Sequence, residues 1–239
     1  MRRILLALAM LLALMTTWAT TVHARDWDVS ERQGHLSLGL TGGLTQPVGQ
    51  LGRDVNMEAN VGDSGLNLDW GLNGGAFVDY FLTDRWAIGG FVGTGKLYMK
   101  DLTVQTGGGA RTYSKLVEGQ TTLLGGYAKY FMNPRGSWSP YVYLGAAHVD
   151  REAHLSQGVL ELYPGATVFD IRDDRVGWVG GVGADYAWTR TLGVGVVASY
   201  DYSGQLDHEF PWMGHQTIVH DWSFLTLHAV LTYRLRGME

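Results

Sequence analysis

The sequence lacks cysteine, extended apolar runs and an excess of basic residues, and each absence excludes a class of protein. Without cysteine there is no disulfide scaffold and no thiolate metal site. The 18 Lys and Arg residues against 23 Asp and Glu residues give a net charge of −5, which excludes a nucleic-acid binder that relies on a basic surface. The one long apolar run, Ile4–Met15, is far shorter than the about 20 residues of a membrane-spanning helix. Nevertheless 46% of the residues are hydrophobic, which excludes a disordered chain.

The first 24 residues have the pattern of an export signal. Arg2 and Arg3 precede the apolar run, and Val22 and Ala24 place small residues at the −3 and −1 positions of a cut before Arg25. The alternative is a buried N-terminal helix. We expect residues 1–24 to be a signal peptide, cleaved near Ala24, and residues 25–239 to form one exported domain.

The rest of the chain alternates between apolar and small or polar residues with a period of two. A β-strand points successive side chains to opposite faces, so this pattern predicts strands with two different environments. No segment after residue 24 has a convincing helical stripe. The strands with a clear phase run through residues 36–45, 69–80, 176–188, 192–202 and 225–234, and the segments 86–99, 117–131 and 141–150, whose phase is open, complete a set of eight.

The connections alternate in length, which predicts an up-and-down arrangement. Residues 82–85, 132–140 and 189–191 are short and rich in turn residues. Residues 46–68, 100–116, 151–175 and 203–222 are long. Transmembrane β-barrels have this asymmetry, with short periplasmic turns and long outer loops. An even number of strands places both chain termini on the short-turn side.

A soluble barrel with its apolar face inward also alternates, and three observations favour the transmembrane form. The small or polar face carries mostly Gly, Ser, Thr and Asn, whereas a water-exposed face is normally about a quarter to a third charged. Several strands reach the about 9–11 residues that cross a bilayer. Aromatic residues gather near both strand ends, as in the girdles of membrane barrels. The predicted girdle comprises Tyr80, Trp86, Tyr130, Tyr186, Trp188 and Tyr233 near the short turns and Trp70, Trp178, Tyr200 and Tyr202 at the other end, with Phe81, Phe131, Tyr141 and Tyr143 also assigned to the apolar face.

Three strand–turn segments resemble those of the small OmpA/OmpX-like outer-membrane barrels. They are Tyr80–Gly89, Ser139–Ala146 and Val182–Thr189. The resemblance implies an eight-stranded antiparallel transmembrane β-barrel in the outer membrane of a Gram-negative-type cell, surrounded by lipid and lipopolysaccharide. It also implies insertion by the barrel assembly machinery, which reads a terminal aromatic residue. Tyr233 fits that position, but six further residues, 234–239, follow it.

Four charged residues of the inward phase lie near the short-turn end. Asp79, Asp185 and Arg234 share the small-residue phase, and Lys129 shares it if Tyr130 faces lipid. Two acids and two bases at similar depth can pair across the lumen, which makes their burial tolerable. This predicts a charge network that plugs the barrel, with a narrow ion path as the alternative. Asp69, Asp201 and His228 extend the polar interior.

The signals for catalysis and for metal binding are weak. His35 and Ser37, and likewise His154 and Ser156, have the His-x-Ser spacing of some lipid A deacylases, but no carboxylate accompanies either pair at a fixed spacing. We expect His35 to open the first strand and His154 to lie in a loop. The histidines and acids of residues 207–221 match no standard metal site. We therefore expect no catalytic residue, no cofactor and no metal.

The resulting hypothesis is an outer-membrane barrel with a structural role or a role in interactions through its loops. The alternatives are a porin-like narrow pore or hydrophobic-solute transporter, and a lipid A-modifying hydrolase. An extracellular ligand would bind at the outer loops, where apolar residues occur at Leu160, Tyr163, Val168, Phe169 and 210–213.

Overall fold

The computed structural model describes residues 32–48, 69–98, 102–106, 109–113, 117–134, 136–155, 170–210 and 216–235. Eight long antiparallel strands form a closed barrel in the order β1-β10-β9-β8-β7-β6-β3-β2, and β4 and β5 pair separately. The strands are β1 (Leu36–Val48), β2 (Gly71–Phe81), β3 (Trp86–Tyr98), β4 (Leu102–Thr106), β5 (Gly109–Tyr113), β6 (Val117–Phe131), β7 (Trp138–Leu155), β8 (Asp170–Ala187), β9 (Leu192–Phe210) and β10 (Gln216–Leu235). The predicted eight-stranded antiparallel up-and-down barrel is confirmed.

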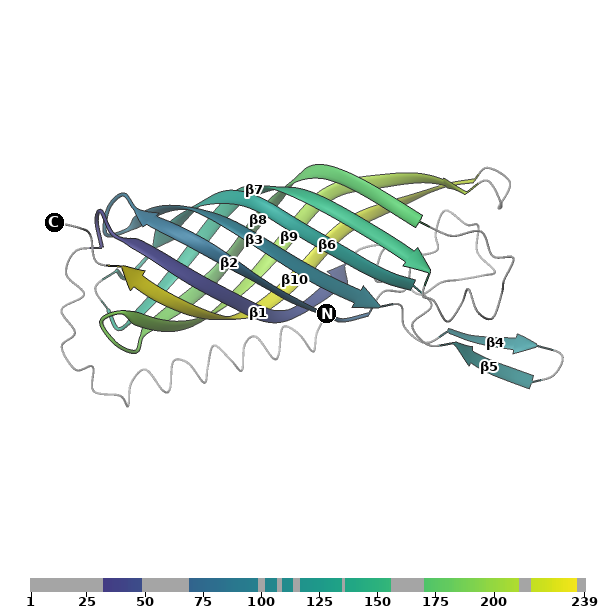
Figure 1. Cartoon of the computed structure of the whole chain (residues 1–239), viewed down its shortest axis with the longest axis horizontal. Helices are drawn as coiled ribbons and strands as arrows, with labels where there is room; N and C mark the ends of the chain where they lie inside the picture. The colour runs from purple at the N-terminus through teal and green to yellow at the C-terminus, as the bar shows by residue number, and fades with distance from the viewer. Residues whose placement is uncertain are drawn as a thin grey trace.

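The short connections all lie at one end of the barrel, at the left in Figure 1. β1 begins and β10 ends at this same end, where Leu36 pairs with Leu235. The Thr83 hydroxyl accepts hydrogen bonds from the backbone N–H groups of Arg85 and Trp86, and Thr189 does the same for Thr191 and Leu192. These side-chain bonds replace backbone pairing in the tight reversals between strands. We call this the short-turn end and the opposite one the outer end.

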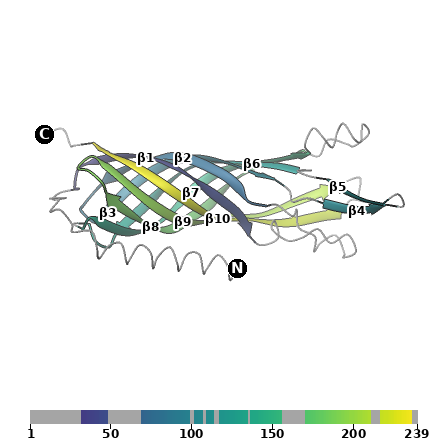
Figure 2. The same cartoon turned by 90° about the horizontal axis from the view of Figure 1, so that it is seen from below.

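Parts of the predicted long loops 100–116, 151–175 and 203–222 prove to be strand. Residues 151–155 continue β7 and residues 170–175 begin β8, so His154 lies in a strand and not in a loop. β9 and β10 likewise continue pairing as far as Phe210 with Gln216. Figures 1 and 2 show β7–β10 extending toward the outer end, where β4 and β5 also lie. The alternation fades in these extensions, where charged residues such as Arg151, Asp173 and Asp174 are frequent, and sequence patterning therefore missed them.

The barrel is narrow and its strands are strongly staggered. Following paired residues once around from Ser37 leads back to β1 at Pro47, ten residues along the strand. An eight-stranded barrel has an interior that side chains alone can fill. The register is continuous except for one irregularity in β10 between Asp221 and Ser223. Consequently the inward side chains of all eight strands face one narrow lumen.

The two faces of the wall have the predicted contrast. Large apolar side chains are exposed on the outside, among them Leu40 (61%), Leu124 (63%), Leu144 (64%) and Val176 (73%). Ser37, Thr45, Ser199 and Thr226 are buried inside. Soluble monomers rarely expose so continuous an apolar band, whereas acyl chains cover one in a membrane. The structure also shows which face of β3, β6 and β7 points outward, because Ile88, Leu124 and Leu144 are exposed. Lys129 lies on the face of β6 opposite to Leu124 and therefore points inward.

Four aromatic residues assigned to the outer face lie inside instead. Phe81, Phe131 and Tyr141 are almost completely buried, and Tyr143 packs against the same cluster. The interior is therefore aromatic as well as small and polar. Glycines on neighbouring strands provide the space for these rings: a Cβ on Gly183 would collide with the ring of Tyr141. Period-two alternation did not separate two faces that both carry aromatic residues.

The predicted signal peptide, residues 1–24, and its cleavage site lie outside the described residues. Among the residues that the structure describes, no helix has the length and apolar character needed to cross a bilayer.

Candidate functional site

A buried ion pair lies inside the barrel near the short-turn end. Lys129 Nζ on β6 is 2.7 Å from Asp79 Oδ2 on β2, and the two side chains are only 6% and 3% exposed. Asp79 Oδ1 also accepts a hydrogen bond from the Tyr127 hydroxyl. The carboxylate is thus held by two inward side chains of β6, which lie two residues apart on one face. The pair spans from β2 to β6, across β3.

Aromatic rings surround the Lys129 ammonium. Its Nζ lies 4.7 Å from the ring centroid of Tyr141 and 4.8 Å from that of Phe77. The Tyr127 and Phe131 centroids are 5.1 and 5.8 Å away. At such distances the negative ring faces attract a cation, and the attraction is stronger away from water. The ammonium therefore has one carboxylate and several ring faces in place of its hydration shell.

Arg32, just before β1, closes the same end of the barrel. Its guanidinium donates a 2.6 Å hydrogen bond to Ser139 Oγ and lies 4.7 Å from the Phe131 ring centroid. Its backbone N–H bonds to Asp84 in the turn after β2. Burial lowers the pKa of Arg32 to about 10; nearby Arg234 contributes in the same direction, and Asp185 and Asp84 oppose it. Arg32, Phe81, Phe131, Tyr141 and the Asp79–Lys129 pair together form what we call the plug.

The other two members of the predicted network are near the plug but less directly paired. Asp185 is buried and lies within electrostatic reach of Lys129, Arg32 and Arg234. Its Oδ1 atom has no hydrogen-bond partner in the described part of the chain. Arg234 is joined to Asp185 only through this longer-range attraction. Asp79 and Lys129 are in direct contact, whereas Asp185 and Arg234 are not.

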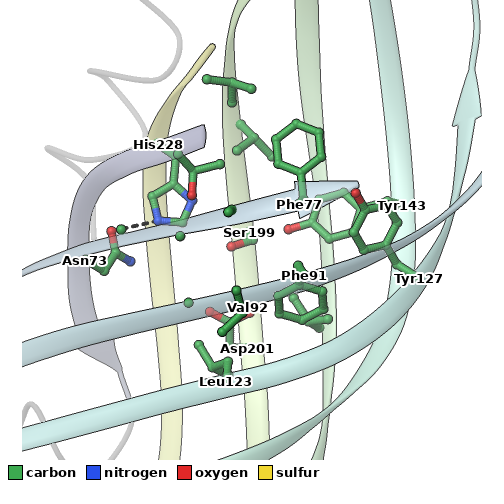
Figure 3. A pocket seen from close by; sticks show the side chains of 18 of the residues that line it. Asn73, Phe77, Phe91, Val92, Leu123, Tyr127, Tyr143, Ser199, Asp201 and His228 are labelled. Carbon is green, nitrogen blue, oxygen red and sulfur yellow. Dashed lines mark hydrogen bonds between the residues drawn. The ribbon is translucent and has the colours of Figure 1, made fainter. Parts of the chain in front are cut away.

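Beyond the plug, toward the outer end, the lumen contains a cavity of about 110 Å³ (Figure 3). Aromatic and aliphatic side chains provide most of its lining, among them Phe77, Phe91, Tyr127 and Tyr143. Its polar residues include Asp201 and His228, whose Nε2 is 2.7 Å from Asn73 Oδ1. Asp69, expected to extend the polar interior as well, does not line this cavity; its backbone N–H bonds to Tyr98 O.

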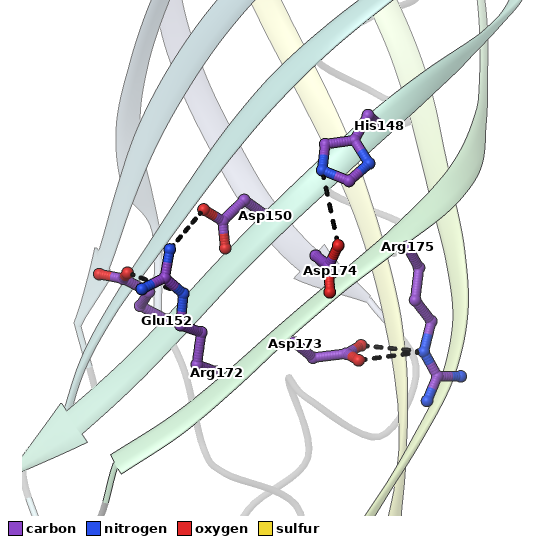
Figure 4. Close-up of polar contacts among 7 residues, drawn as sticks. All are labelled: His148, Asp150, Glu152, Arg172, Asp173, Asp174 and Arg175. Atoms are coloured by element: carbon purple, nitrogen blue, oxygen red, sulfur yellow. Dashed lines mark hydrogen bonds and ion pairs between the residues drawn. The ribbon is translucent and has the colours of Figure 1, made fainter.

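The outer part of β7 and β8 carries a band of charged side chains (Figure 4). Arg172 lies 3.4 Å from Asp150 and 3.5 Å from Glu152, and both contacts are partly exposed. His148 Nε2 is 3.8 Å from Asp174 Oδ2. On the inward face, Arg175 pairs with Asp173 at 3.0 Å, and the fully buried Arg151 donates to Ser203 O. The ion pairs lie directly beyond the outward apolar residues Val176 and Leu144.

Eight residues of the predicted girdle are exposed on the barrel surface, including Trp178 and Trp188 at 63% each. The other two, Tyr130 and Tyr186, are half-buried because they pack on Trp86 and Trp138 with ring centroids 5.0 and 5.1 Å apart. The remaining members are exposed at Trp70, Tyr80, Trp86, Tyr200, Tyr202 and Tyr233.

The His35–Ser37 pair does not form a hydrolytic site in the described residues. Ser37 Oγ is buried and has no hydrogen-bond partner, so His35 does not activate it. β1 begins one residue after His35. Ser156 and the apolar loop residues 160–169 and 211–213 lie outside the described residues, as do the side chains of His154 and of residues 207–210. No group of three or more His, Asp or Glu residues suited to a metal occurs in the part described.

Sequence reasoning missed several residues of the interior. Tyr127 lies on the same face of β6 as Lys129, and Tyr141 lies on the same face of β7 as Ser139. Both could have been predicted to point inward once the inward faces of β6 and β7 were known. Arg32 could not be predicted as an interior residue because it precedes the first strand and has no alternation around it. Arg151 was not predicted because its segment was interpreted as a loop.

Residues 5–218 match a family model described as outer membrane protein beta-barrel domain. The match covers most of the sequence, so the chain belongs to this family, and the resemblance to the small outer-membrane barrels is confirmed. The protein is an integral β-barrel of the outer membrane, in contact with its lipids.

Several solved structures are similar to this chain at low sequence identity, and OprG among them shows the same fold. OprG of Pseudomonas aeruginosa is 12% identical with a TM-score of 0.58, and the alignment covers 87% of this chain and 99% of that one. Neisserial surface protein A is 14% identical with a TM-score of 0.49, over 83% and 96% of the two chains. The N-terminal barrel domain of Pseudomonas aeruginosa OprF is 14% identical with a TM-score of 0.47, over 85% and 98%. No curated protein matches the sequence.

Proposed function

We propose that the protein is a non-conducting barrel with a structural role in the outer membrane that makes its contacts through the outer ends of β7–β10. The observation that supports this most is the plug. Lys129 and Asp79 are buried against Tyr127 and Tyr141, and an ion that passed this end would have to displace them. Eight-stranded barrels leave little room beyond their own side chains.

The proposal includes two membrane interfaces. The exposed aromatic residues near the short turns, such as Trp86 and Trp188, lie at the inner one, and Trp70 and Trp178 at the outer one. Amphipathic rings favour this depth because one part of the ring is apolar and another is polar. The cleaved signal peptide and insertion by the barrel assembly machinery belong to the same proposal.

Planar-bilayer recording tests the closed lumen. The purified protein is expected to insert without conductance steps at any voltage, because the plug leaves no continuous aqueous path. A general porin inserted in the same bilayers provides the positive control. Regular conductance steps from the protein itself would refute the proposal and favour the narrow-pore alternative.

The charged outer band is expected to contact lipopolysaccharide headgroups. Its ion pairs begin where the outward apolar band ends, and Arg172 is 69% exposed there. An exposed guanidinium binds phosphate in a bidentate manner. Arg172→Gln should therefore reduce the lipopolysaccharide that remains bound to protein extracted from outer membranes, as measured by native mass spectrometry.

Arg190→Gln is the matched control for this experiment. Arg190 is an exposed arginine in the turn between β8 and β9, at the opposite end of the barrel. Lipopolysaccharide occupies only the outer leaflet, so this substitution should leave retention unchanged. Equal retention by the two variants would contradict a role for the outer band.

A further inference from the structure

The cavity beyond the plug contains a carboxylate for which the structure provides no counter-charge. Asp201 lies on β9 and shares the inward phase of Ser199, and both residues line the cavity (Figure 3). In the described residues, Asp201 makes no hydrogen bond or ion pair within contact distance. Its neighbour Ser199 is already engaged with the hydroxyls of Thr226 and Tyr143.

The surroundings of Asp201 are mostly aromatic. Phe91 and Tyr127 pack with ring centroids 5.9 Å apart, and Tyr127 and Tyr143 with centroids 5.6 Å apart. All three rings line the cavity. A carboxylate in such surroundings is costly unless a partner compensates its charge. Lys129, the cation that also lines the cavity, is held by Asp79 at 2.7 Å.

The same lumen already shows how it accommodates a cation. The Lys129 ammonium is held by one carboxylate and by the rings of Tyr141 and Phe77. Asp201, Phe91 and Tyr143 line the cavity and provide the same combination of one carboxylate and aromatic ring faces. Cation–π attraction and an unpaired carboxylate both favour a positively charged ligand.

We propose that this cavity binds a small organic cation, with its ammonium group between Asp201 and the rings of Phe91 and Tyr143. The volume of about 110 Å³ suits the alkylammonium group of such a molecule, since an engineered cavity of about 150 Å³ holds the six heavy atoms of benzene. The Asn73–His228 hydrogen bond provides polar atoms for a hydroxyl on the ligand.

The lining argues against a metal ion as the occupant. Calcium takes six or more oxygen ligands, and zinc takes several His, Cys or carboxylate ligands. The described residues contain no group of three His, Asp or Glu side chains that would hold a metal. Rings and a single carboxylate discriminate instead in favour of a weakly hydrated alkylammonium. Because the plug closes the short-turn end, the ligand does not pass through the barrel.

Titration of the purified protein in detergent with choline and tetramethylammonium tests the proposal, with binding followed by saturation-transfer NMR. The alcohol 3,3-dimethylbutan-1-ol has the shape of choline but no charge, so comparing the two separates the contribution of the charge from that of the shape. Both cations should bind saturably, and the alcohol at least about tenfold more weakly, a difference of roughly 1.4 kcal/mol. Asp201→Asn should weaken choline binding by a similar factor. Asp174→Asn, which removes an exposed outer carboxylate, should bind as the wild type does.

The heat-dependent gel mobility of the barrel reports whether Asp201→Asn folds. If it does not fold, a second variant keeps the test decisive. Phe91→Leu retains the carboxylate and removes one ring, so it should weaken choline several-fold and leave the alcohol unaffected. The proposal is overturned if the wild type binds neither cation saturably. It is equally overturned if choline and the alcohol bind alike, or if both cavity variants retain wild-type affinity.

Discussion

Replacing Lys129 with methionine measures what the buried ion pair contributes to the barrel. The substitution keeps an unbranched side chain one atom shorter and removes its charge, so Asp79 loses its 2.7 Å partner while only 3% exposed. Removing one member of a buried pair typically costs about 3–5 kcal/mol, because the other charge remains without compensation. Asp79 keeps its hydrogen bond from Tyr127, which places the expected loss near the lower end, at about 3 kcal/mol.

The assay is reversible urea unfolding of the protein in lipid vesicles, followed by tryptophan fluorescence. Lys96→Met is the matched control, since Lys96 is 2.9 Å from Glu118 in a pair that is 53% and 26% exposed. Exposed pairs contribute little because water screens them, so this variant should unfold much as the wild type does. The double variant Asp79→Asn with Lys129→Met leaves neither charge stranded and should lose less than the two single losses combined. The reasoning is refuted if Lys129→Met loses no more than Lys96→Met, or if the two plug substitutions are additive.

Two further substitutions test the interior. Arg234→Leu should lower the unfolding temperature of the purified barrel by several degrees, because Asp185 loses a nearby cation; an unchanged circular-dichroism melt in detergent would remove Arg234 from the network. Gly145→Ala should cost roughly 1–3 kcal/mol in urea unfolding, since its Cβ would collide with Gly126 O and lie 2.7 Å from Tyr127 Cβ. Gly42→Ala faces open space and should be neutral, and similar losses in the two glycine variants would show that the close approach at Gly145 is not limiting.

The eight strands and the orientation of most of their faces could be predicted from the sequence because strand periodicity is local. Leu36, Leu38 and Leu40 alternate with small residues, and each assignment needs only its immediate neighbours. The same reasoning failed at Tyr141 and Tyr143, where both faces of β7 carry aromatic residues. It failed again in residues 151–155 and 170–175, where the apolar band ends and the strands continue.

The inward phase of Asp79 also followed from the alternation, and that of Lys129 followed on the condition that Tyr130 faces lipid. Both led to the expectation of a charged interior. Their direct contact did not follow, because they lie on strands separated by β3 and meet only through the stagger of the register. Arg32 belongs to the plug although no pattern surrounds it. Pairing across a lumen depends on the positions of all eight strands together.

Composition and alternation were thus sufficient by themselves to predict an outer-membrane β-barrel with one apolar face and one face of small or polar residues. Only the tertiary structure decided which charges touch, that the rings of Phe81, Phe131 and Tyr141 close the short-turn end, and that a cavity lined by Asp201 lies beyond them. The physical reason is the range of the interactions. The direction of a side chain from a strand is set within two residues, whereas its partner in the lumen is set by closure of the whole barrel.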